Sequence, residues 1–338
     1  MSGHRDKRAG ERGAALLSVL LLVAVMAVIA ATALDRLTLA TRIAGSAATV
    51  DQGRAYTFAA EEIALRRVAD LVGRDTTRLT LAGGWLGRDF ILPLPGGEGR
   101  AKLSDANNCF NLNSLVAETA PGRFSQRSGA MGQFTELMVL LGIDRGEAMA
   151  ITGATADWLD SDSNDGPLGA EDGVYRSMPD TYLAANRIMA DVSELRAVRG
   201  VTPKIYARLK RWICVLPIAE PVKLNVNTLA PEQAPLVAML LPGAITLADA
   251  RAALAARPAG GYGSSVRFWE ARSLERLDPP TDVAEQAGVN SRWLALTTNV
   301  TMGDGFLTAN SLIDANGGAP GPGMAPPVIV RRDWGETD

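Results

Sequence analysis

Hydrophobic residues are most concentrated near the start of the chain, where residues 14–34 form an apolar run without charge, glycine or proline. The only polar side chains in this run are the hydroxyls of Ser18 and Thr32, which can bond back to the carbonyl groups of a helix. About 20 apolar residues cross the hydrocarbon core of a bilayer as a helix, which satisfies its own backbone polar groups there. The run therefore predicts one membrane-spanning helix.

Three interpretations of this run compete. It could be a permanent anchor whose basic leader stays in the cytoplasm, or a secretory signal cut after the small residues at 31–33. It could also be a prepilin-type signal, cut between Gly13 and Ala14, in which the apolar run becomes the start of the mature protein. The leader contains four basic residues within the first 12 positions: Arg5, Lys7, Arg8 and Arg12.

The residues that follow the apolar run favour the prepilin-type interpretation. Residues 35–72 contain no proline, and their apolar positions recur with the spacing of an amphipathic helix continuous with the apolar run. Gly45 and Gly53 weaken the middle of this helix and are expected to allow a bend. A helix covering residues 14–75, apolar first and amphipathic afterwards, is unusual in a globular protein.

Along the rest of the chain the spacing of hydrophobic residues changes twice, from strand-like to helical and back to strand-like. Residues 76–110 predict short antiparallel strands with turns at Gly83-Gly84 and at 95–97, and strand character returns at 292–303, 306–314 and 326–335. Between them the period is helical. We therefore predict an α+β protein in which a sheet unit, 76–110 and 291–338, is interrupted by an all-helical domain at 111–290. The clearer helices in that domain are at 135–143, 145–159, 191–200 and 203–216.

A short internal repeat divides the helical domain. The sequence FNLNSL at 110–115 resembles LNVNTL at 224–229, and helical sequence follows each copy. The simpler explanation is a shared strand-to-helix entry in which Asn and Ser or Thr cap the next helix. The repeat still suggests two similar lobes, at about 111–222 and 223–290.

Four segments together resemble the type II secretion minor pseudopilin K, also called general secretion pathway protein K. Most pilins and pseudopilins carry Glu at the fifth mature position, whereas K-type pseudopilins lack it, and Ser18 occupies that position when Ala14 is the first residue. The resemblance covers nearly the whole chain. Its segments are RGAALLSVLLLVAVMAVIA at the start, DWLDSDSNDGPLGAEDGVY at 157–175, MADVSELRAVRGV at 189–201 and KLNVNTLAPE at 223–232.

The resemblance implies a type IV pilin-like fold, with a long N-terminal helix and an antiparallel sheet, carrying a large insertion. It implies cleavage by the prepilin peptidase after Gly13 and methylation of the new amine of Ala14. It places the chain in the bacterial inner membrane as a single-pass protein with its globular part in the periplasm. The expected role is at the pseudopilus tip, where the protein would initiate and cap assembly for export of folded proteins across the outer membrane, with the I-type and J-type minor pseudopilins as partners.

Composition excludes several other functions. The formal net charge of −3 gives no general drive toward nucleic acid, and the only histidine, His4, lies in the leader. A cleaved chain therefore has no histidine for a catalytic triad, a general base or a zinc ligand. No nucleophile–base motif for an anchored hydrolase is visible. We expect neither enzymatic activity nor a small-molecule substrate.

One segment leaves a DNA-binding alternative open. Residues 193–210 resemble a helix-hairpin-helix, but Gly200-Val201-Thr202-Pro203 lacks the second glycine that lets the backbone approach a phosphate. A packing unit with a solvated basic face is the favoured interpretation. A membrane-anchored DNA-binding protein of the uptake type would require salt-sensitive phosphate binding. The basic residues are Arg196, Arg199, Lys204, Arg208, Lys210 and Arg211.

The two cysteines, Cys109 and Cys214, both follow the membrane run, and two such cysteines in the periplasm usually pair. We expect a disulfide that ties the sheet unit to the helical insertion.

A dense group of oxygen-bearing side chains is the strongest chemical signal after the leader. Carboxylates this close repel one another unless a cation neutralises them, and Ca²⁺ accepts six to eight oxygens in irregular geometry, whereas Mg²⁺ demands a tighter octahedron. The spacing partly mimics an EF-hand, but its glycine comes one position late and no clear exit helix follows. The resemblance implies calcium in this domain, and a solvated acidic loop is the alternative. The candidate ligands are Asp160, Asp162, Asn164, Asp165, Glu171 and Asp172.

Overall fold

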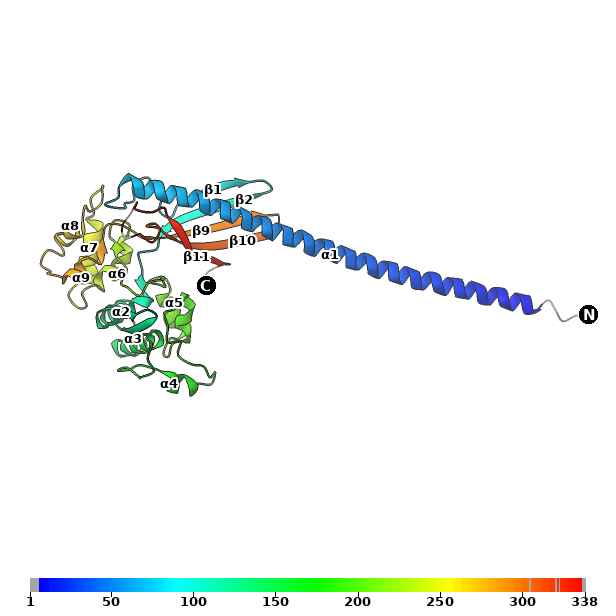
Figure 1. Ribbon diagram of the computed structural model, residues 1–338, viewed down its shortest axis with the longest axis horizontal. Helices are drawn as coiled ribbons and strands as arrows, with labels where there is room; N and C mark the ends of the chain where they lie inside the picture. Colours follow the sequence, from blue (N-terminus) through cyan, green and yellow to red (C-terminus); the bar gives the residue numbers. More distant parts are fainter. Residues whose placement is uncertain (1–5, 304, 320, 322, 336–338) are drawn as a thin grey trace, which may run out of the picture.

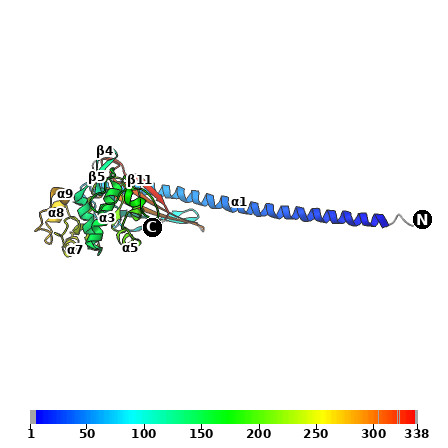
Figure 2. The same cartoon turned by 90° about the horizontal axis from the view of Figure 1, so that it is seen from below.

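The computed structural model describes residues 6–303, 305–319, 321 and 323–335, and of residues 6–13 only the backbone. Its dominant element is α1 (Asp6–Arg74), whose N-terminal half projects alone while its C-terminal half lies along the globular part (Figures 1 and 2). The helix runs through Gly45 and Gly53 without interruption. A Cβ atom at Gly53 would make an ordinary contact with Leu307, 3.4 Å from its Cδ2, so the close packing of α1 on β10 does not require glycine there.

The C-terminal half of α1 packs on a five-stranded antiparallel sheet. The strand order is β1-β2-β9-β10-β11, so the insertion separates the neighbouring strands β2 and β9. Val68 and Val72 of α1 share a buried core with Leu103, Leu296 and Ile313 of the sheet. The strands are β1 (Asp89–Leu94), β2 (Gly97–Asp105), β9 (Trp293–Met302), β10 (Gly305–Asp314) and β11 (Val328–Trp334). The last three coincide closely with the strands predicted from alternation.

An ion pair between a buried glutamate and a partly exposed arginine fixes α1 to the far edge of this sheet. Glu61 is 2% exposed, and its Oε1 accepts hydrogen bonds from Ser311 Oγ at 2.5 Å and Arg332 Nε at 2.6 Å. A second bond joins the guanidinium of Arg332 to Glu61 Oε2. The hydrogen bond to Glu61 raises the pKa of Arg332. A buried charge is tolerated only when it is paired and hydrogen-bonded, so this contact sets the rotation of α1 on the sheet.

The inserted chain forms two lobes, each closed by a short parallel strand pair. In the first lobe β3 (Phe110–Asn111) pairs with β6 (Ile213–Cys214), and in the second β7 (Leu224–Asn225) pairs with β8 (Ala287–Gly288). The chain therefore enters and leaves each lobe at neighbouring points. The first lobe contains α2 (Ser128–Leu140), α3 (Arg145–Leu159), α4 (Asp172–Arg176) and α5 (Pro203–Leu209); the second contains α6 (Ala234–Ala238), α7 (Leu247–Ala255), α8 (Ser265–Trp269) and α9 (Thr281–Ala284).

The internal repeat has the same structure in both copies. The second asparagine of each copy, Asn113 or Asn227, forms two hydrogen bonds with one backbone residue across its lobe. Asn113 Nδ2 donates to Met189 O and its Oδ1 accepts from Met189 N, while Asn227 does the same with Tyr262. The first asparagine of each copy caps the turn that follows it. The repeat asparagines therefore close the lobes as well as capping.

The insertion is not purely helical, contrary to the prediction. Besides the two parallel pairs, a hairpin of β4 (Val116–Ala120) and β5 (Arg123–Gln126) lies in the first lobe. The helix predicted at 203–216 ends at Leu209, because residues 213–214 are needed as β6 to close the lobe. The segment predicted as a helix at 191–200 contains a 3₁₀ helix, Val192–Ala197. The helix predicted at 135–143 corresponds to α2, which begins earlier, at Ser128, and ends at Leu140.

The turn predicted at Gly83-Gly84 is present, but the short strands predicted around it, within residues 79–87, do not form. This segment forms turns, because Gly83, Gly84 and Gly87 all have positive φ angles that a strand does not use. Trp85 is 7% exposed, and its Nε1 donates to Thr80 O at 2.7 Å. The turns therefore place Trp85 against the sheet core.

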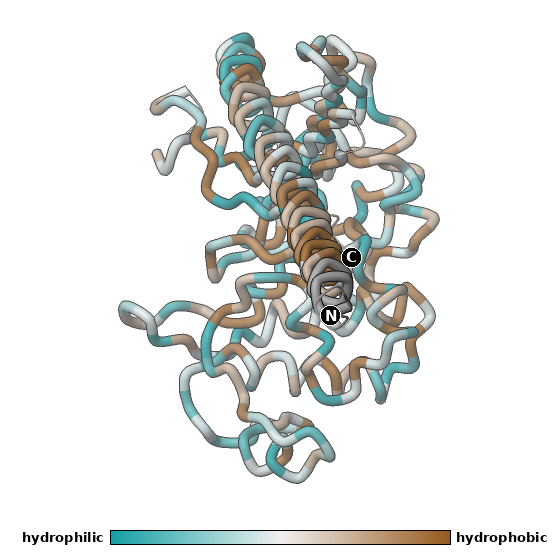
Figure 3. The backbone as a smooth tube through the Cα atoms, turned by 90° about the vertical axis from the view of Figure 1, so that its right-hand side faces the viewer, coloured by the Kyte–Doolittle hydropathy of each residue, from teal (hydrophilic) through white to brown (hydrophobic). Residues whose placement is uncertain are grey.

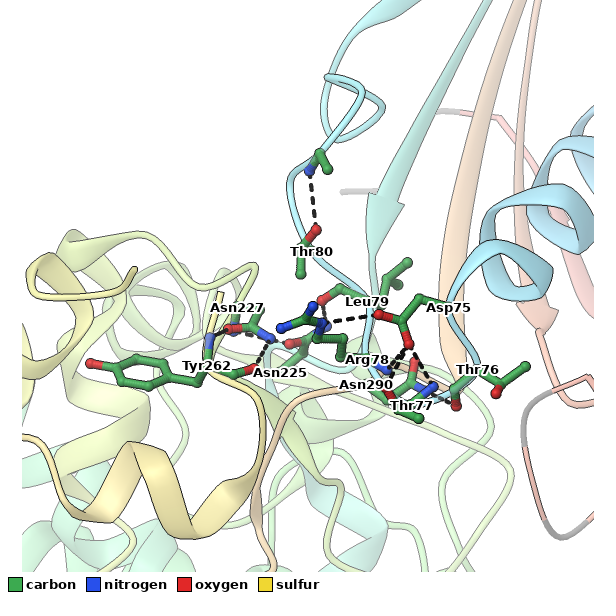
Figure 4. Close-up of polar contacts among 11 residues, drawn as sticks. Asp75, Thr76, Thr77, Arg78, Leu79, Thr80, Asn225, Asn227, Tyr262 and Asn290 are labelled. Carbon is green, nitrogen blue, oxygen red and sulfur yellow. Dashed lines mark hydrogen bonds and ion pairs between the residues drawn. The ribbon is translucent and has the colours of Figure 1, made fainter. Parts of the chain in front are cut away.

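The segment that follows α1 joins the sheet to the second lobe (Figure 4). Leu79 O accepts a hydrogen bond from Asn225 Nδ2 at 3.0 Å, and Thr76 O accepts one from Asn290 Nδ2 at 3.2 Å. Asp75 ends the helix by accepting bonds from Thr77 and from Arg78, and the bond from the Thr77 hydroxyl is the main cause that lowers the pKa of Asp75 to about 2.

Candidate functional site

The N-terminal half of α1 has the properties of a membrane segment. Within the described residues it is the one helix long and apolar enough to span a bilayer, and none of its most apolar window is buried in the protein. In Figure 3 several turns of α1 behind the N-terminus are brown, the colour of hydrophobic residues. Ser18 Oγ donates to Ala14 O at 2.9 Å, so the hydroxyl at the fifth position after Gly13 is satisfied by the helix itself.

The processing residues Gly13 and Ala14 follow one another inside α1. The start of the leader, including His4 and Arg5, lies outside the described residues. The structure therefore places the expected cut at the start of the exposed apolar half but does not test it.

Three buried carboxylates form the centre of the acidic group. Asp157 lies in the last turn of α3, Asp160 directly follows that helix, and Glu171 precedes α4. Their exposed fractions are 0%, 2% and 3%. Gln126 Nε2 donates to Asp157 Oδ1 at 2.7 Å and to Asp160 Oδ2 at 2.8 Å. One neutral amide thus bridges two acidic side chains.

The acidic loop closes tightly around Asp157. Gly166 N donates to Asp157 Oδ2 at 3.1 Å, and a Cβ atom on Gly166 or Gly169 would clash with the Asp157 carboxylate. Gly153 of α3 is similarly covered, since a Cβ atom there would lie 2.9 Å from Pro167 O. Leu168 has φ of 62°, a left-handed conformation that costs a non-glycine residue free energy. The loop is therefore built closely around a carboxylate.

Part of this carboxylate group has no protein partner. Asp160 Oδ1 and both carboxylate oxygens of Glu171 are buried and make no hydrogen bond in the described part of the chain. Burial, reinforced by the neighbouring carboxylates, raises the pKa of Asp160 to about 6 and that of Glu171 to about 7. Burial also raises the pKa of Asp157. Unpaired buried oxygens of this kind are costly, and a cation would neutralise them.

The other predicted ligands lie around this centre. Asp162, Asn164 and Asp165 are exposed on the same loop, where Asp162 Oδ1 accepts from Asn164 N at 2.8 Å and Asp165 Oδ1 accepts from Glu171 N at 2.9 Å. Asp172 forms a salt bridge with Arg176 at 3.0 Å. Across the residues that the structure describes, no three acidic, histidine or cysteine side chains converge into a preformed metal cage.

Two residues of this region were missed by the sequence analysis. Asp157 lies in the last turn of the predicted helix at 145–159, three positions before Asp160, a spacing that brings the two side chains close where the helix ends. Asn186 donates from Nδ2 to Asp162 O at 3.0 Å, and its Oδ1 is buried without a partner among the described residues. Nothing in the sequence pattern indicates Asn186, which the fold brings in from a separate loop.

The basic segment at 193–211 uses its cations for packing. Arg199 Nη1 donates to Gly169 O at 3.1 Å, and Arg208 Nη1 donates to Gly142 O at 2.9 Å. The guanidinium of Arg211 lies over the ring of Trp212 at 4.9 Å. These contacts favour the packing interpretation over a phosphate-binding hairpin.

Cys109 and Cys214 form a disulfide with a Cα–Cα distance of 5.7 Å. Cys109 directly precedes β3 and Cys214 is the last residue of β6. The bond therefore closes the base of the first lobe, instead of tying the sheet to the insertion as we predicted. The two strands that it joins are the ones that pair to close that lobe.

Comparison with known proteins agrees with this architecture. Two family models, both described as type II secretion system protein K, match residues 108–218 and 224–290. The chain is 34% identical to type II secretion system protein K of Klebsiella pneumoniae over 96% of this chain and 97% of that protein. It is 33% identical to the protein of the same description from Pseudomonas aeruginosa over 88% and 86%.

A solved structure has the same fold. A chain in the crystal structure of the GspK-GspI-GspJ complex from the enterotoxigenic Escherichia coli type 2 secretion system superposes with a TM-score of 0.72 at 29% identity. The match covers 86% of this chain and 99% of that one. A long N-terminal helix, an antiparallel sheet and a large two-lobed insertion are thus found together with sequence identity along nearly the whole length. The chain belongs to the type II secretion system protein K family, the minor pseudopilins.

Proposed function

We propose that this chain is the subunit that starts and caps the pseudopilus of a type II secretion system, during export of folded proteins across the outer membrane. The observation that carries this proposal is the combination of a membrane-length helix lacking a charged fifth residue with a bulky insertion at the opposite end. The chain would act by binding and positioning other subunits, without catalysing a reaction.

Ser18 supports the tip position. In other pilin-like subunits a fifth-position glutamate is expected to need a partner in the apolar environment, because a lone carboxylate in hydrocarbon is costly. Ser18 carries no charge, and its hydroxyl is already bonded to Ala14 O. A subunit with this side chain needs no neighbour above it. The two lobes, residues 111–290, also suit an exposed end better than a packed shaft.

The membrane topology follows from the same helix. The basic leader would remain in the cytoplasm, and the sheet and both lobes would lie in the periplasm. The prepilin peptidase would cut between Gly13 and Ala14. Gly13→Val should block the cut, whereas Gly10→Val, in the same leader, should not. Intact-mass measurement of membrane-extracted protein decides this, and a mature chain that starts elsewhere than Ala14 contradicts it.

The partners would be the I-type and J-type minor pseudopilins. The solved structure that this chain resembles is a complex of GspK with GspI and GspJ, and the match covers 99% of one chain in it. Co-purification of this chain with both partners from membranes tests the assignment. Recovery of DNA in a salt-dependent manner instead would favour the DNA-binding alternative.

We further propose that calcium binds the acidic loop. Asp160 and Glu171 would be the central ligands, since Asp160 Oδ1 and both carboxylate oxygens of Glu171 have no hydrogen-bond partner in the described part of the chain, and Asp157 would lie directly beside them. Exposed oxygens of Asp162, Asn164 and Asp165 are available on the same loop, whereas Asp172 is engaged by Arg176. The ion would neutralise carboxylates that otherwise repel one another and would fix the loop against α3.

The tip assignment can be tested in cells. Immunogold labelling of pseudopili should find this protein at one end, and a strain lacking it should assemble pseudopili with impaired initiation or altered length. Labelling spread along the shaft, or normal assembly without the protein, would contradict the proposal. Ser18→Glu should bring no benefit to assembly at the tip.

A further inference from the structure

A crevice separates the first lobe from the sheet. Ser311 of β10 bonds to Glu61 of α1, so its neighbour Leu312 faces away from α1, toward the first lobe. On the lobe side the crevice is lined by residues 191–193 and 214–216. Its volume is about 770 Å³, within the range of pockets that bind ligands. An occupant must therefore fit between a wall from the sheet and a wall from the lobe.

The basic segment of the first lobe borders this crevice. Residues 195–219 contain six cations and no acidic residue, and all six cations are exposed. In the part of the chain that the structure describes, none of the six forms an ion pair. Lys210 and Arg211 line the crevice directly. The guanidinium of Arg196 lies 5.8 Å from the ring centre of Tyr206, which also lines it. The lobe wall of the crevice is therefore basic.

The acidic residues of the crevice already have partners. Asp333 Oδ2 lies 3.1 Å from Nε of Arg331, its neighbour on the same strand. Asp191 caps the 3₁₀ helix that follows it, where its side chain accepts a backbone hydrogen bond. Among the described residues, Lys210 and Arg211 are thus left without a carboxylate to neutralise them. An anionic occupant would supply that charge.

A phosphate backbone does not suit this basic wall. Thr202 caps α5 by accepting a bond from Ile205 N, and Pro203 in the first turn has no N–H group. Arg199 and Arg208 already donate to backbone carbonyls of the lobe. The start of α5 therefore offers few free N–H groups to a phosphate, in agreement with the missing second glycine of the hairpin.

A lipid bilayer lies too far from the crevice. Arg332, next to Arg331 in β11, is bonded to Glu61 of α1. Between Leu34, at the end of the apolar run, and Glu61 the helix rises about 40 Å. Attraction to lipid headgroups is screened within about 8 Å at physiological ionic strength. Carboxylates of another protein are the anions that fit this position.

We propose that the crevice binds an extended acidic segment of another protein. A folded domain cannot enter between the two walls, whereas an extended chain can. Alternate side chains of an extended chain point to opposite sides. Its carboxylates would contact Lys210 and Arg211, while its apolar side chains would contact Val192 and Leu312. The site goes beyond the proposed role in assembly and does not depend on it.

The first test measures peptide binding by fluorescence anisotropy with the full-length chain in detergent. A labelled peptide of alternating Asp and Val should bind, and high salt should weaken the binding. Lys210→Glu with Arg211→Glu should weaken it at least about tenfold, because two attractions become repulsions. The control is Arg251→Glu with Arg272→Glu, at two exposed cations of the second lobe, which should leave binding unchanged.

Several outcomes of this test would overturn the proposal. They are no binding of the acidic peptide, equal binding of a peptide of alternating Lys and Val, and undiminished binding by the Lys210→Glu, Arg211→Glu variant. Displacement of the peptide by duplex DNA at equal charge concentration would favour a phosphate ligand instead. Because the peptide alone is the probe, the result does not depend on where the subunit sits in the pseudopilus.

A second measurement locates the bound peptide on the unchanged protein. The same peptide with a photoreactive group at its centre should form adducts within residues 191–216 or 310–333, which supply the two walls of the crevice. Mass spectrometry of the digested adduct identifies the site. Adducts that lie only on the second lobe or on α1 would contradict the proposal, even if the acidic peptide binds.

Discussion

Replacing Glu171 by glutamine separates the two roles that this buried carboxylate has with and without calcium. Both carboxylate oxygens of Glu171 are buried and have no hydrogen-bond partner among the residues that the structure describes, and burial raises the pKa of Glu171 from 4.5 to about 7. Folding therefore favours the protonated form. The unfolded chain ionises near 4.5, so stability falls as pH rises from about 4.5 to 7 and changes little above that range.

The size of the effect follows from the two pKa values. The pKa of Glu171 rises from 4.5 to about 7 on folding. Its ionisation therefore lowers the unfolding free energy by about 3 kcal/mol at pH 8. Glu171→Gln removes the charge but leaves an amide with few partners, which offsets part of the gain. We expect the variant to be more stable than the unchanged protein by about 1–3 kcal/mol in chelator at pH 8, and to differ little at pH 4.5.

Calcium should remove most of this difference. A ligand at 100 times its Kd stabilises the folded state by about 2.7 kcal/mol. The unchanged protein should show a gain of this order when calcium replaces chelator, and Glu171→Gln should lose most of it because a charged ligand is missing. The control is Glu275→Gln, at an exposed position in the second lobe.

Urea unfolding of the detergent-solubilised chain, at pH 4.5 and pH 8 with calcium or chelator, measures all four conditions. Calorimetric titration with calcium gives an independent reading. Equal calcium responses in the unchanged protein and in Glu171→Gln would refute the assignment of this residue as a ligand. A calcium-free stability that does not fall between pH 4.5 and 8 would refute the charge argument itself.

Three further substitutions test the contacts that hold the fold. Replacing Cys109 and Cys214 by serine should lower the unfolding free energy by up to about 4–5 kcal/mol, because the bond closes a loop spanning 105 positions. Glu61→Ala should cost about 1–3 kcal/mol, because it removes the buried carboxylate that bonds to Ser311 and to the partly exposed guanidinium of Arg332. Gly169→Ala should cost about 1–3 kcal/mol by forcing a Cβ atom against Asp157. Urea unfolding measures each value.

Each of these substitutions has a control nearby. Glu62→Ala removes an exposed glutamate from the same helix, and Gly173→Ala adds a Cβ atom where no other atom lies within 4 Å. Both should change the unfolding free energy by less than about 0.5–1 kcal/mol. For the cysteines, peptide mapping of periplasm-derived protein without reductant should find one linked pair. Two free thiols there would show that the bond is not formed.

The long helix and the C-terminal strands could be predicted from the sequence because their signals are local. The apolar run of α1 and the alternation in β9, β10 and β11 are complete within each segment. The end of α5 could not be predicted in this way. Apolar residues continue past Leu209, but Ile213 pairs with Phe110, and that partner lies far away in the sequence. The distant strand, not the local period, decides the conformation there.

In the acidic loop, too, some features follow from the local sequence and others depend on distant contacts. The density of carboxylates was evident from the sequence. The three-residue spacing of Asp157 and Asp160 was also visible there and could have indicated Asp157 as part of the group. Which oxygens stay unpartnered depends on the fold, since Gln126 bonds to Asp160 and Arg176 pairs with Asp172. The contact from Asn186 depends on a loop that approaches from a separate part of the lobe. Ligand number cannot be derived from carboxylate count alone.

The direct pairing of β2 with β9 constrains the order in which this chain folds. Asp105 and Leu294 lie opposite each other at the end of that ladder, with both lobes in between. Closing so long a flexible loop is slow and entropically costly. Each lobe, however, brings its own ends together through β3 and β6 or β7 and β8, which shortens the effective loop to a few residues. The lobes should therefore fold first and the sheet afterwards. Pulsed hydrogen exchange during refolding should find α3 protected before β9.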